Sequence, residues 1–247
     1  MHLTEDDTPR IRPLVALRAL RQLRHDPQDA QQFWLLTEAL RGRSGLRLMQ
    51  RFNRHPSGRK VLQQRRSLAA ILQNRAALER LPRGSLGRSY AEFMRAEPPT
   101  AAERVALGQQ AQCFHPTAPS DLVFLSARLR EMHDLFHVLT GYGRDLLGEL
   151  CVMAFCYPQQ GTRSFAALAL MGSLQLRRSL ALPEVTRAVR QAYHHGRYAA
   201  WIPGQPVEDL LADNLDALRA RWRILPPTEY RAALARLQTE PSGLAQA

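Results

Sequence analysis

The stretch from His133 to Glu149 constrains the fold most, because its possible metal ligands can meet only if the chain turns back on itself. His133 and His137 are four residues apart, so a helix would project both imidazoles from one face. Glu149 follows His137 by twelve residues, and a straight helix would carry it roughly 18 Å away. Gly141 and Gly143 can end a first helix and reverse the chain. The sequence therefore predicts two helices joined by a turn, the second of which returns Glu149 to the histidines.

The histidine pair also has an ordinary explanation, because two histidines on one helix face are more often packed or exposed than bound to a metal. The interpretation as a metal site is strengthened because Asp134, the pair of glycines that ends the helix, and Glu149 all lie in the same short stretch. Closed structural zinc sites usually use cysteine thiolates, whereas imidazoles mixed with carboxylates leave room for water or substrate. Zn, Fe and Mn all accept such ligands. The pattern therefore predicts one divalent metal in a catalytic type of site and leaves the ion open.

An HD-type phosphohydrolase is a second interpretation of the neighbouring histidine and aspartate, since such enzymes also bind metal through that pair. A site of that kind would need a further histidine upstream, for which His115 is the nearest candidate, and an aspartate downstream. The position of Glu149 favours the first interpretation.

Apolar residues recur at helical spacings of three and four along most of the chain. No stretch alternates apolar and polar residues for long enough to predict a strand, and no repeat or low-complexity linker divides the sequence. We therefore predict an all-α fold, with a single compact multi-helix domain at 13–237 between a flexible N-terminal segment at 1–12 and a flexible tail at 238–247. Besides the helix-turn-helix pair, the segments expected to be helical are 14–24, 27–40, 46–52, 56–64, 67–81, 165–176, 184–193 and 207–222.

The chain is strongly basic, with a net charge of +12, which could indicate a nucleic-acid partner. Its 34 basic residues are all arginine except Lys60, and no motif of a nucleic-acid-binding module is present. Such uniform arginine usage, beside abundant Ala and Leu, looks as much like an effect of base composition as a binding site. We therefore predict no nucleic-acid partner.

Basic residues are concentrated near the start, where residues 1–66 hold fourteen Lys and Arg against six acidic residues. In the segments 14–24 and 46–52 arginines are interleaved with Leu, Met and Phe, a pattern compatible with an anionic membrane surface. A solvated helix face with an ordinary core side is the alternative. No stretch approaches the roughly 20 apolar residues of a spanning helix, and the acidic start is unlike a targeting peptide. We expect a cytoplasmic protein, peripheral on the inner face of the membrane.

The pattern His-Asp-x-x-His, eleven further residues and Glu is formed by His133, Asp134, His137 and Glu149. It resembles the metal-binding signature of the Coq4 family of ubiquinone-biosynthesis proteins and matches that signature at all four positions. Other parts of the family are similar to further segments of this chain, so the resemblance covers most of residues 15–225. These segments are 58–62 (GRKVL), 81–94 (LPRGSLGRSYAEFM) and 208–219 (EDLLADNLDALR).

One short segment departs from the family pattern. After the second histidine the family usually reads Gly-Leu-Pro-Thr, whereas residues 141–144 here read Gly-Tyr-Gly-Arg. The departure leaves the four signature residues in place and concerns the contacts that the turn would make with a substrate.

The resemblance implies an enzyme of ubiquinone (coenzyme Q) biosynthesis. Its reaction would be the metal-dependent C1 decarboxylation of a polyprenylated hydroxybenzoate, in an oxidative version that also installs a hydroxyl group. The four signature residues are the expected metal ligands, with Glu149 and Asp134 also catalytic. Arg130, one turn before the first histidine, is a candidate partner for the substrate carboxylate, and a surface or supporting charge is the alternative. The segments 146–155 and 165–174 are candidates to line a tunnel for the prenyl tail, or else ordinary core.

A second function fits the same resemblance, namely a non-catalytic prenyl-lipid-binding scaffold that organises quinone-biosynthesis enzymes at the membrane. The expected partners are a polyprenylated aromatic lipid, an anionic membrane surface, other quinone-biosynthesis proteins and a second copy of the chain in a homodimer. Turnover separates the two functions. A scaffold changed at Glu149 would lose assembly or lipid binding, whereas an enzyme could keep its lipid and lose CO2 release.

Overall fold

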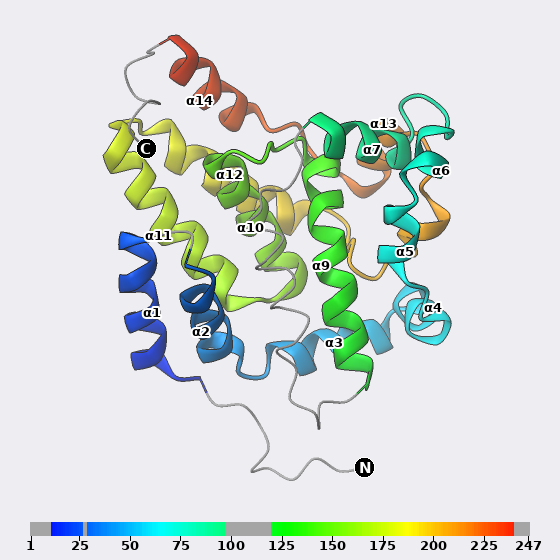
Figure 1. Ribbon diagram of the computed structural model, residues 1–247, viewed down its shortest axis with the longest axis horizontal. Coiled ribbons are helices and arrows are strands. Elements are labelled where there is room, and N and C mark those ends of the chain that lie inside the picture. The colour runs from blue at the N-terminus through cyan, green and yellow to red at the C-terminus, as the bar shows by residue number, and fades with distance from the viewer. Residues whose placement is uncertain (1–10, 27–28, 97–119, 240–247) are drawn as a thin grey trace.

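Helices make up the regular structure of this protein in the computed structural model, which describes residues 11–26, 29–96 and 120–239 (Figure 1). Within these ranges the β-type backbone pairing consists of an isolated bridge between Ser85 and Asn214. The all-α prediction is therefore confirmed.

The predicted flexible ends fall largely outside the described residues, as does His115. Most connections between the described helices are short. The helices in chain order are α1 (Pro13–His25), α2 (Ala30–Arg41), α3 (Ser44–Arg54), α4 (Pro56–Gln64), α5 (Leu68–Gln73), α6 (Arg75–Glu79), α7 (Leu86–Ala96), α9 (Ser120–Thr140), α10 (Leu146–Gln160), α11 (Arg163–Leu180), α12 (Glu184–Tyr198), the 3-10 turn η2 (Val207–Asp209), α13 (Leu215–Trp222) and α14 (Thr228–Thr239).

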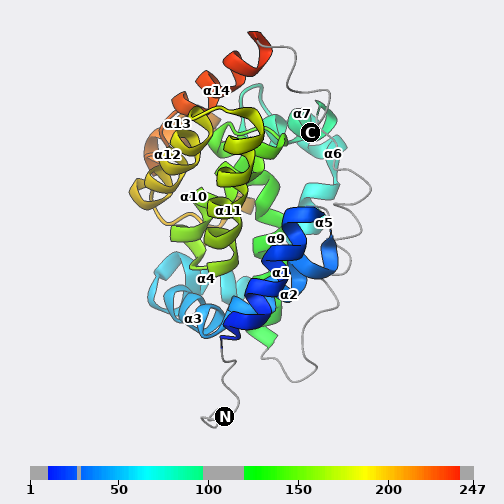
Figure 2. The same ribbon diagram turned by 90° about the vertical axis from the view of Figure 1, so that its left-hand side faces the viewer.

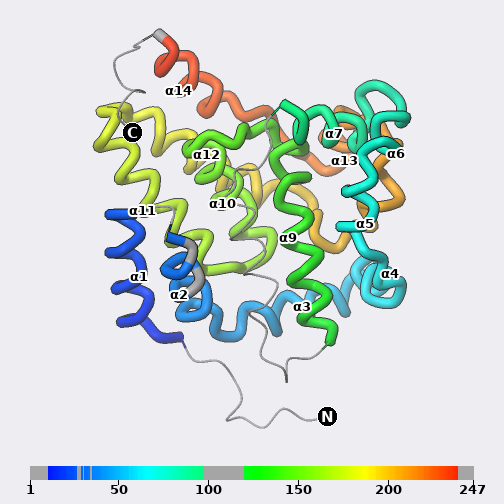
Figure 3. The backbone as a smooth tube through the Cα atoms, viewed as in Figure 1, coloured from blue at the N-terminus to red at the C-terminus, as the bar shows by residue number. Residues whose placement is uncertain are grey.

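Helix α10 lies in the middle of the molecule and packs against α9, α11 and α12. The backbone trace shows α9 and α10 as neighbours that run in opposite directions (Figure 3). The largest apolar cluster gathers around them, and Phe136 of α9 meets Phe155 of α10 with ring centroids 6.0 Å apart. Packing on several sides thus fixes both helices that carry the signature residues.

Helices α1 and α2 form a smaller apolar cluster against α11, and α1 lies nearest the viewer in Figure 2. Helix α1 leaves Leu14 and Leu17 exposed, whereas α3 buries Leu48 and Phe52. In α3 the apolar residues that lie among the arginines therefore belong to the core. In α1 some of them lie on the surface of the protein. No helix among the described residues has the length and apolar composition needed to cross a bilayer.

The predicted helix at 207–222 divides into the 3-10 turn η2 and α13. Asn214 starts α13, because its Oδ1 accepts a hydrogen bond from the Ala217 N–H (2.9 Å). The stretch before it pairs with the start of α7 instead of forming helix, as in the bond from the Gly87 N–H to the Leu211 carbonyl oxygen (2.8 Å). These contacts between distant segments satisfy the backbone groups that a helix would have paired locally.

The predicted helix at 67–81 also divides, into α5 and α6. The break is at Asn74, whose Oδ1 accepts a hydrogen bond from the Ala77 N–H (3.2 Å) and so begins a new helix. An asparagine in mid-segment competes with the helix for backbone hydrogen bonds, which explains this break.

Candidate metal centre

The turn between α9 and α10 is sharp. Gly141, the residue after α9, takes a left-handed φ of +76°, and its N–H donates to the His137 carbonyl oxygen (2.8 Å). Asp145 then caps α10, since its Oδ1 accepts the N–H of Gly148 (3.0 Å). The predicted helix-turn-helix arrangement is confirmed, and it places Glu149 in the first turn of α10, beside the histidines.

Three of the four predicted ligands converge. His137 Nε2 lies 3.2 Å from Glu149 Oε1, and His133 Nε2 lies 3.5 Å from Glu149 Oε2. One ligand atom from each residue lies within 4.8 Å of the other two. His137 is buried, while the side chain of His133 is 29% exposed, so the group is reached from the His133 side. We refer to these three residues as the metal group.

Within the metal group, two hydrogen-bond acceptors face each other. His137 Nδ1 donates to the carbonyl oxygen of Tyr142 (3.1 Å), which leaves a lone pair on Nε2. Among the described residues, neither this Nε2 nor the buried Glu149 Oε1 has a hydrogen-bond partner of normal geometry. Two buried acceptors 3.2 Å apart are costly unless a cation lies between them. The donor set therefore fits a divalent metal.

Charges inside the site outweigh the effect of burial. Burial raises the pKa of Glu149, but His137, whose Nε2 lies 3.2 Å from the carboxylate, and the charges of His133 and Arg144 bring that pKa below its ordinary value. The pKa of Asp134 is lowered in the same way, against its burial, by His133 and Arg144. Burial lowers the pKa of His133, but Asp134 and Glu149 raise it above its ordinary value. Both carboxylates are thus ionised at neutral pH, as metal ligands must be.

Asp134, the fourth predicted ligand, lies beside the metal group and faces another partner. Its Oδ1 is 2.6 Å from Nη2 of Arg144 and 3.7 Å from Nδ1 of His133. That Nδ1 is the ring nitrogen of His133 that does not face Glu149. The role of Asp134 as a ligand stays a prediction.

Helix α7 covers one side of the site. The ring of Phe93 stacks on the His137 imidazole, with centroids 5.6 Å apart and 20° between the planes. The Arg144 guanidinium lies over the same phenyl ring (5.3 Å), and its Nη2 is 3.3 Å from the Met94 sulfur. One indirect signal for these contacts was present in the sequence, because most of α7 lies in the segment at 81–94 that is similar to the family.

Two residues from the last helices hold the turn in place. The Tyr230 hydroxyl of α14 donates to Asp145 Oδ2 and accepts from the Gly143 N–H (2.9 Å). Arg219 of α13 donates from Nε and Nη2 to carbonyl oxygens in the last turn of α9, both at 2.9 Å. Sequence reasoning gave neither residue a role, since both lie 80 positions or more from their partners; Arg219 ends the family-like segment at 208–219, and Tyr230 lies in none of these segments.

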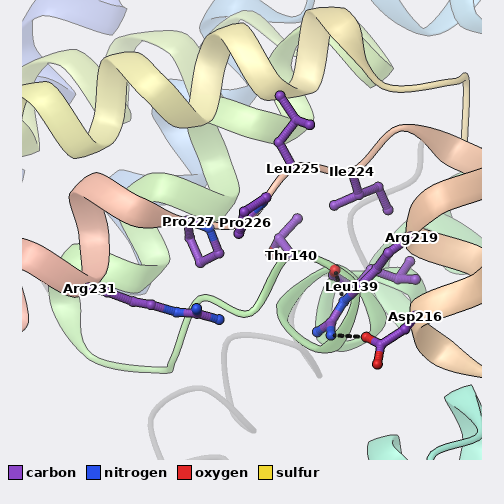
Figure 4. Close-up of a pocket in the computed structure, with 9 residues that line it drawn as sticks. All are labelled: Leu139, Thr140, Asp216, Arg219, Ile224, Leu225, Pro226, Pro227 and Arg231. Atoms are coloured by element: carbon purple, nitrogen blue, oxygen red, sulfur yellow. Dashed lines mark hydrogen bonds and ion pairs between the residues drawn. The ribbon is translucent and has the colours of Figure 1, made fainter.

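A cavity of about 230 Å³ lies behind the turn, bordered by the last turn of α9. Arg219 and Arg231 enter it from opposite sides, and Arg219 is paired with Asp216 (Figure 4). Thr140 and residues 224–227 complete the lining. No member of the metal group is among these residues, so the cavity is separate from the metal centre.

Arg130 lies half-buried on α9, one turn before the first histidine. Its charge acts on Glu131, whose pKa is nevertheless raised, because burial and the charge of Asp134 oppose that effect. Its role toward a substrate carboxylate stays a prediction. The two segments named as tunnel candidates pack closely against each other. A Cβ added to Gly172 would lie only 2.5 Å from a methyl carbon of Leu150, a residue of the largest apolar cluster, so at this point the segments form ordinary core.

Comparison with known proteins identifies the same family that the four signature residues resemble. The family model described as "Coenzyme Q (ubiquinone) biosynthesis protein Coq4" matches residues 12–228. The Rattus norvegicus protein named "Ubiquinone biosynthesis protein COQ4 homolog, mitochondrial" is 29% identical over 191 residues, which cover 76% of this chain and 68% of the rat protein. The Homo sapiens protein of the same name is 28% identical over the same shares. A crystal structure of a Nostoc punctiforme protein superposes with a TM-score of 0.63 at 20% identity, covers 86% of this chain and 98% of its own, and shows the fold alone.

Proposed function

Because this chain belongs to the Coq4 family of ubiquinone biosynthesis proteins, we propose that it catalyses the metal-dependent C1 decarboxylation of a polyprenylated hydroxybenzoate, in the oxidative version. The observation that carries the proposal is the pair of buried acceptors, His137 Nε2 and Glu149 Oε1, with His133 beside them. Two imidazoles and a carboxylate can bind Zn, Fe or Mn and leave positions free for a substrate.

The residues divide the proposed reaction between them. The bond that breaks joins the ring carbon C1 to the carboxylate carbon, and its electron pair stays on the ring as CO2 leaves. A bound divalent metal would supply positive charge that stabilises the negative charge developing on substrate oxygens. The metal group would hold that ion, Arg130 is the proposed partner of the substrate carboxylate, and Phe93 shields His137 from water. In the oxidative version C1 gains a hydroxyl group, which requires O2 and a two-electron donor.

We also propose that α1 attaches the protein to an anionic membrane, in which a polyprenylated substrate would dissolve. Leu14, Leu17, Arg18 and Arg21 are all exposed, and their spacing places them on one helix face. Leucines of such a face enter the headgroup region while the arginines bind anionic lipids. A position on the inner face of the membrane, a homodimer and contact with other quinone-biosynthesis proteins remain predictions.

The test measures metal content and CO2 release on the same anaerobic preparation of the full chain, given a prenylated 4-hydroxybenzoate and ascorbate as the two-electron donor, with and without O2. Stoichiometric metal and CO2 release in the wild type, with release lost in Glu149→Ala, would support the enzyme. The matched control is Glu79→Ala, which removes an exposed carboxylate paired with Arg95 far from the motif in sequence.

The other outcomes distinguish the oxidative reaction, simple decarboxylation, the scaffold and the absence of a metal site. CO2 release that needs O2 supports the oxidative version, and release without O2 supports simple decarboxylation. Metal without CO2 release under either condition contradicts the enzyme and favours the prenyl-lipid scaffold. A wild type without metal contradicts the metal site itself.

A further inference from the structure

Arg144 is the residue at which the turn departs most in charge from the family pattern, and it lies against the metal centre. Its Nη2 is 2.6 Å from Asp134 Oδ1, and its side chain is 11% exposed against 22% for that of Asp134. Ion pairs this enclosed are screened much less than pairs on the surface. Asp134 would therefore have to leave a charged partner to become a metal ligand, which costs free energy.

The two ligand histidines are supported in the same way. His137 Nδ1 donates to the Tyr142 carbonyl oxygen, and His133 Nδ1 faces the Asp134 carboxylate. In both rings the other nitrogen, Nε2, is left facing Glu149. A partner on the second nitrogen commonly fixes the orientation and tautomer of a metal-binding histidine.

We infer that Arg144 and Asp134 act together as a positioning pair. Arg144 holds Asp134 behind His133, where the carboxylate orients the imidazole and stays out of the ligand set. The metal is then bound by the metal group alone, His133, His137 and Glu149. The inference rests on the proposed metal-dependent function and specifies its ligand set. Three protein ligands in place of four leave one more position for substrate, water or O2.

The test uses Co²⁺ as the probe on the full chain without substrate, because the visible absorption of Co²⁺ reports the number and kind of its ligands. Asp134→Asn is expected to keep the wild-type spectrum while its Co²⁺ affinity falls about tenfold, since support is lost and no ligand is lost. Glu149→Gln is expected to change the spectrum, because it removes a charged ligand. This contrast separates a supporting residue from a ligand.

Variants of Arg144 test the other half of the pair. Arg144→Gln is expected to release Asp134, so that the spectrum changes toward a higher coordination number as the carboxylate joins the metal. Adding Asp134→Asn in the same chain is expected to restore the wild-type spectrum. Arg144→Lys keeps the charge and is expected to keep that spectrum as well.

Two results would overturn the inference and leave the proposed function standing. A changed spectrum in Asp134→Asn would make Asp134 a direct ligand, and an Arg144→Gln spectrum equal to that of the wild type would leave Arg144 without the role. The Asp134→Asn comparison decides the matter even where an Arg144 variant fails to fold. A wild type that binds no Co²⁺ overturns this inference and the proposed function together. Metal bound as expected without CO2 release overturns the decarboxylation alone.

Discussion

One ring nitrogen of His137, Nδ1, is fixed by a hydrogen bond, and the other, Nε2, faces Glu149. The group that holds it is a backbone carbonyl, that of Tyr142, so any residue at that position could supply the contact. The support for the second histidine is therefore independent of the side chains in the turn. A turn that reads Gly-Tyr-Gly-Arg in place of Gly-Leu-Pro-Thr can still supply this contact to His137.

At the residue scale, the charge state of His133 makes metal binding dependent on pH. Burial lowers its pKa, but the nearby carboxylates of Asp134 and Glu149 raise it above the ordinary 6.5. The metal binds the neutral imidazole, so protons compete with it once the pH falls below this raised pKa. We expect a constant affinity at higher pH and a loss approaching about tenfold per pH unit below that pKa, beginning above pH 6.5.

Titration of Co²⁺ into the protein between pH 6 and 8.5, in buffers that do not chelate metal, checks this dependence. Asp134 and Glu149 add nothing to it, because their pKa values are lowered and both stay ionised over the whole range. An affinity that stays flat down to pH 6 would contradict the prediction.

The sequence was sufficient to predict that the metal group converges, because residues four apart share a helix face and the glycines after the first helix let the chain return Glu149 to them. It was insufficient for Arg144, whose long side chain takes its direction from Phe93 and Met94 on another helix. The position of Asp134 follows from that direction. The convergence of the metal group was thus predictable from the sequence, and the contacts around it were not.

At the scale of elements, the start of α10 touches the turn that precedes it. A Cβ on Gly148 would lie 2.1 Å from the Gly143 carbonyl oxygen, and backbone cannot move aside cheaply. Gly148→Ala is expected to displace the first turn of α10 and with it Glu149. Overpacking of this kind costs about 1–3 kcal/mol, so we expect Co²⁺ affinity to fall about tenfold or more.

A Co²⁺ titration of the purified variant measures this effect. Gly45→Ala in α3 is the matched control, because the nearest atom to its added Cβ is a leucine methyl at 3.7 Å, an ordinary contact. Equal affinities for the Gly148 variant and the wild type would contradict the prediction.

Helices were predictable where each one buries its own apolar stripe, as α9 and α12 do. The predictions at 67–81 and 207–222 were wrong as single helices, because Asn74 and Asn214 each begin a new helix there. In the second case the chain between the two parts pairs with α7, more than a hundred residues earlier. Periodicity reports which residues are apolar and carries no information about such distant backbone pairing.

At the scale of the whole molecule, a buried ion pair joins α9 to the segment before α13. Arg128 and Glu208 are both almost fully buried, and Arg128 Nη2 also donates to the Gln205 carbonyl oxygen (2.9 Å). Removing one partner leaves the other charge buried without compensation. Glu208→Ala is therefore expected to lower the free energy of unfolding by about 3–5 kcal/mol, measured by denaturant titration.

The neighbouring residue provides the control. Asp209 pairs with Lys60 and Arg66 on the surface, and Asp209→Ala is expected to cost about 1 kcal/mol or less. The double change of Arg128→Met with Glu208→Leu is expected to recover most of the stability lost in Glu208→Ala, because no charge is then left buried. Equal losses for the two single variants would show that burial of the pair is unimportant.

The hold of Tyr230 and Arg219 on the turn has a consequence for how the protein is made. The three residues of the metal group leave the ribosome 70 to 97 residues before these two, from the interval between Glu149 and Arg219 to that between His133 and Tyr230. Until α13 and α14 are synthesised, the ligands lie on helices whose connecting turn has not been fastened. We therefore expect stable metal binding only after α13 and α14 have been synthesised and have fastened the turn.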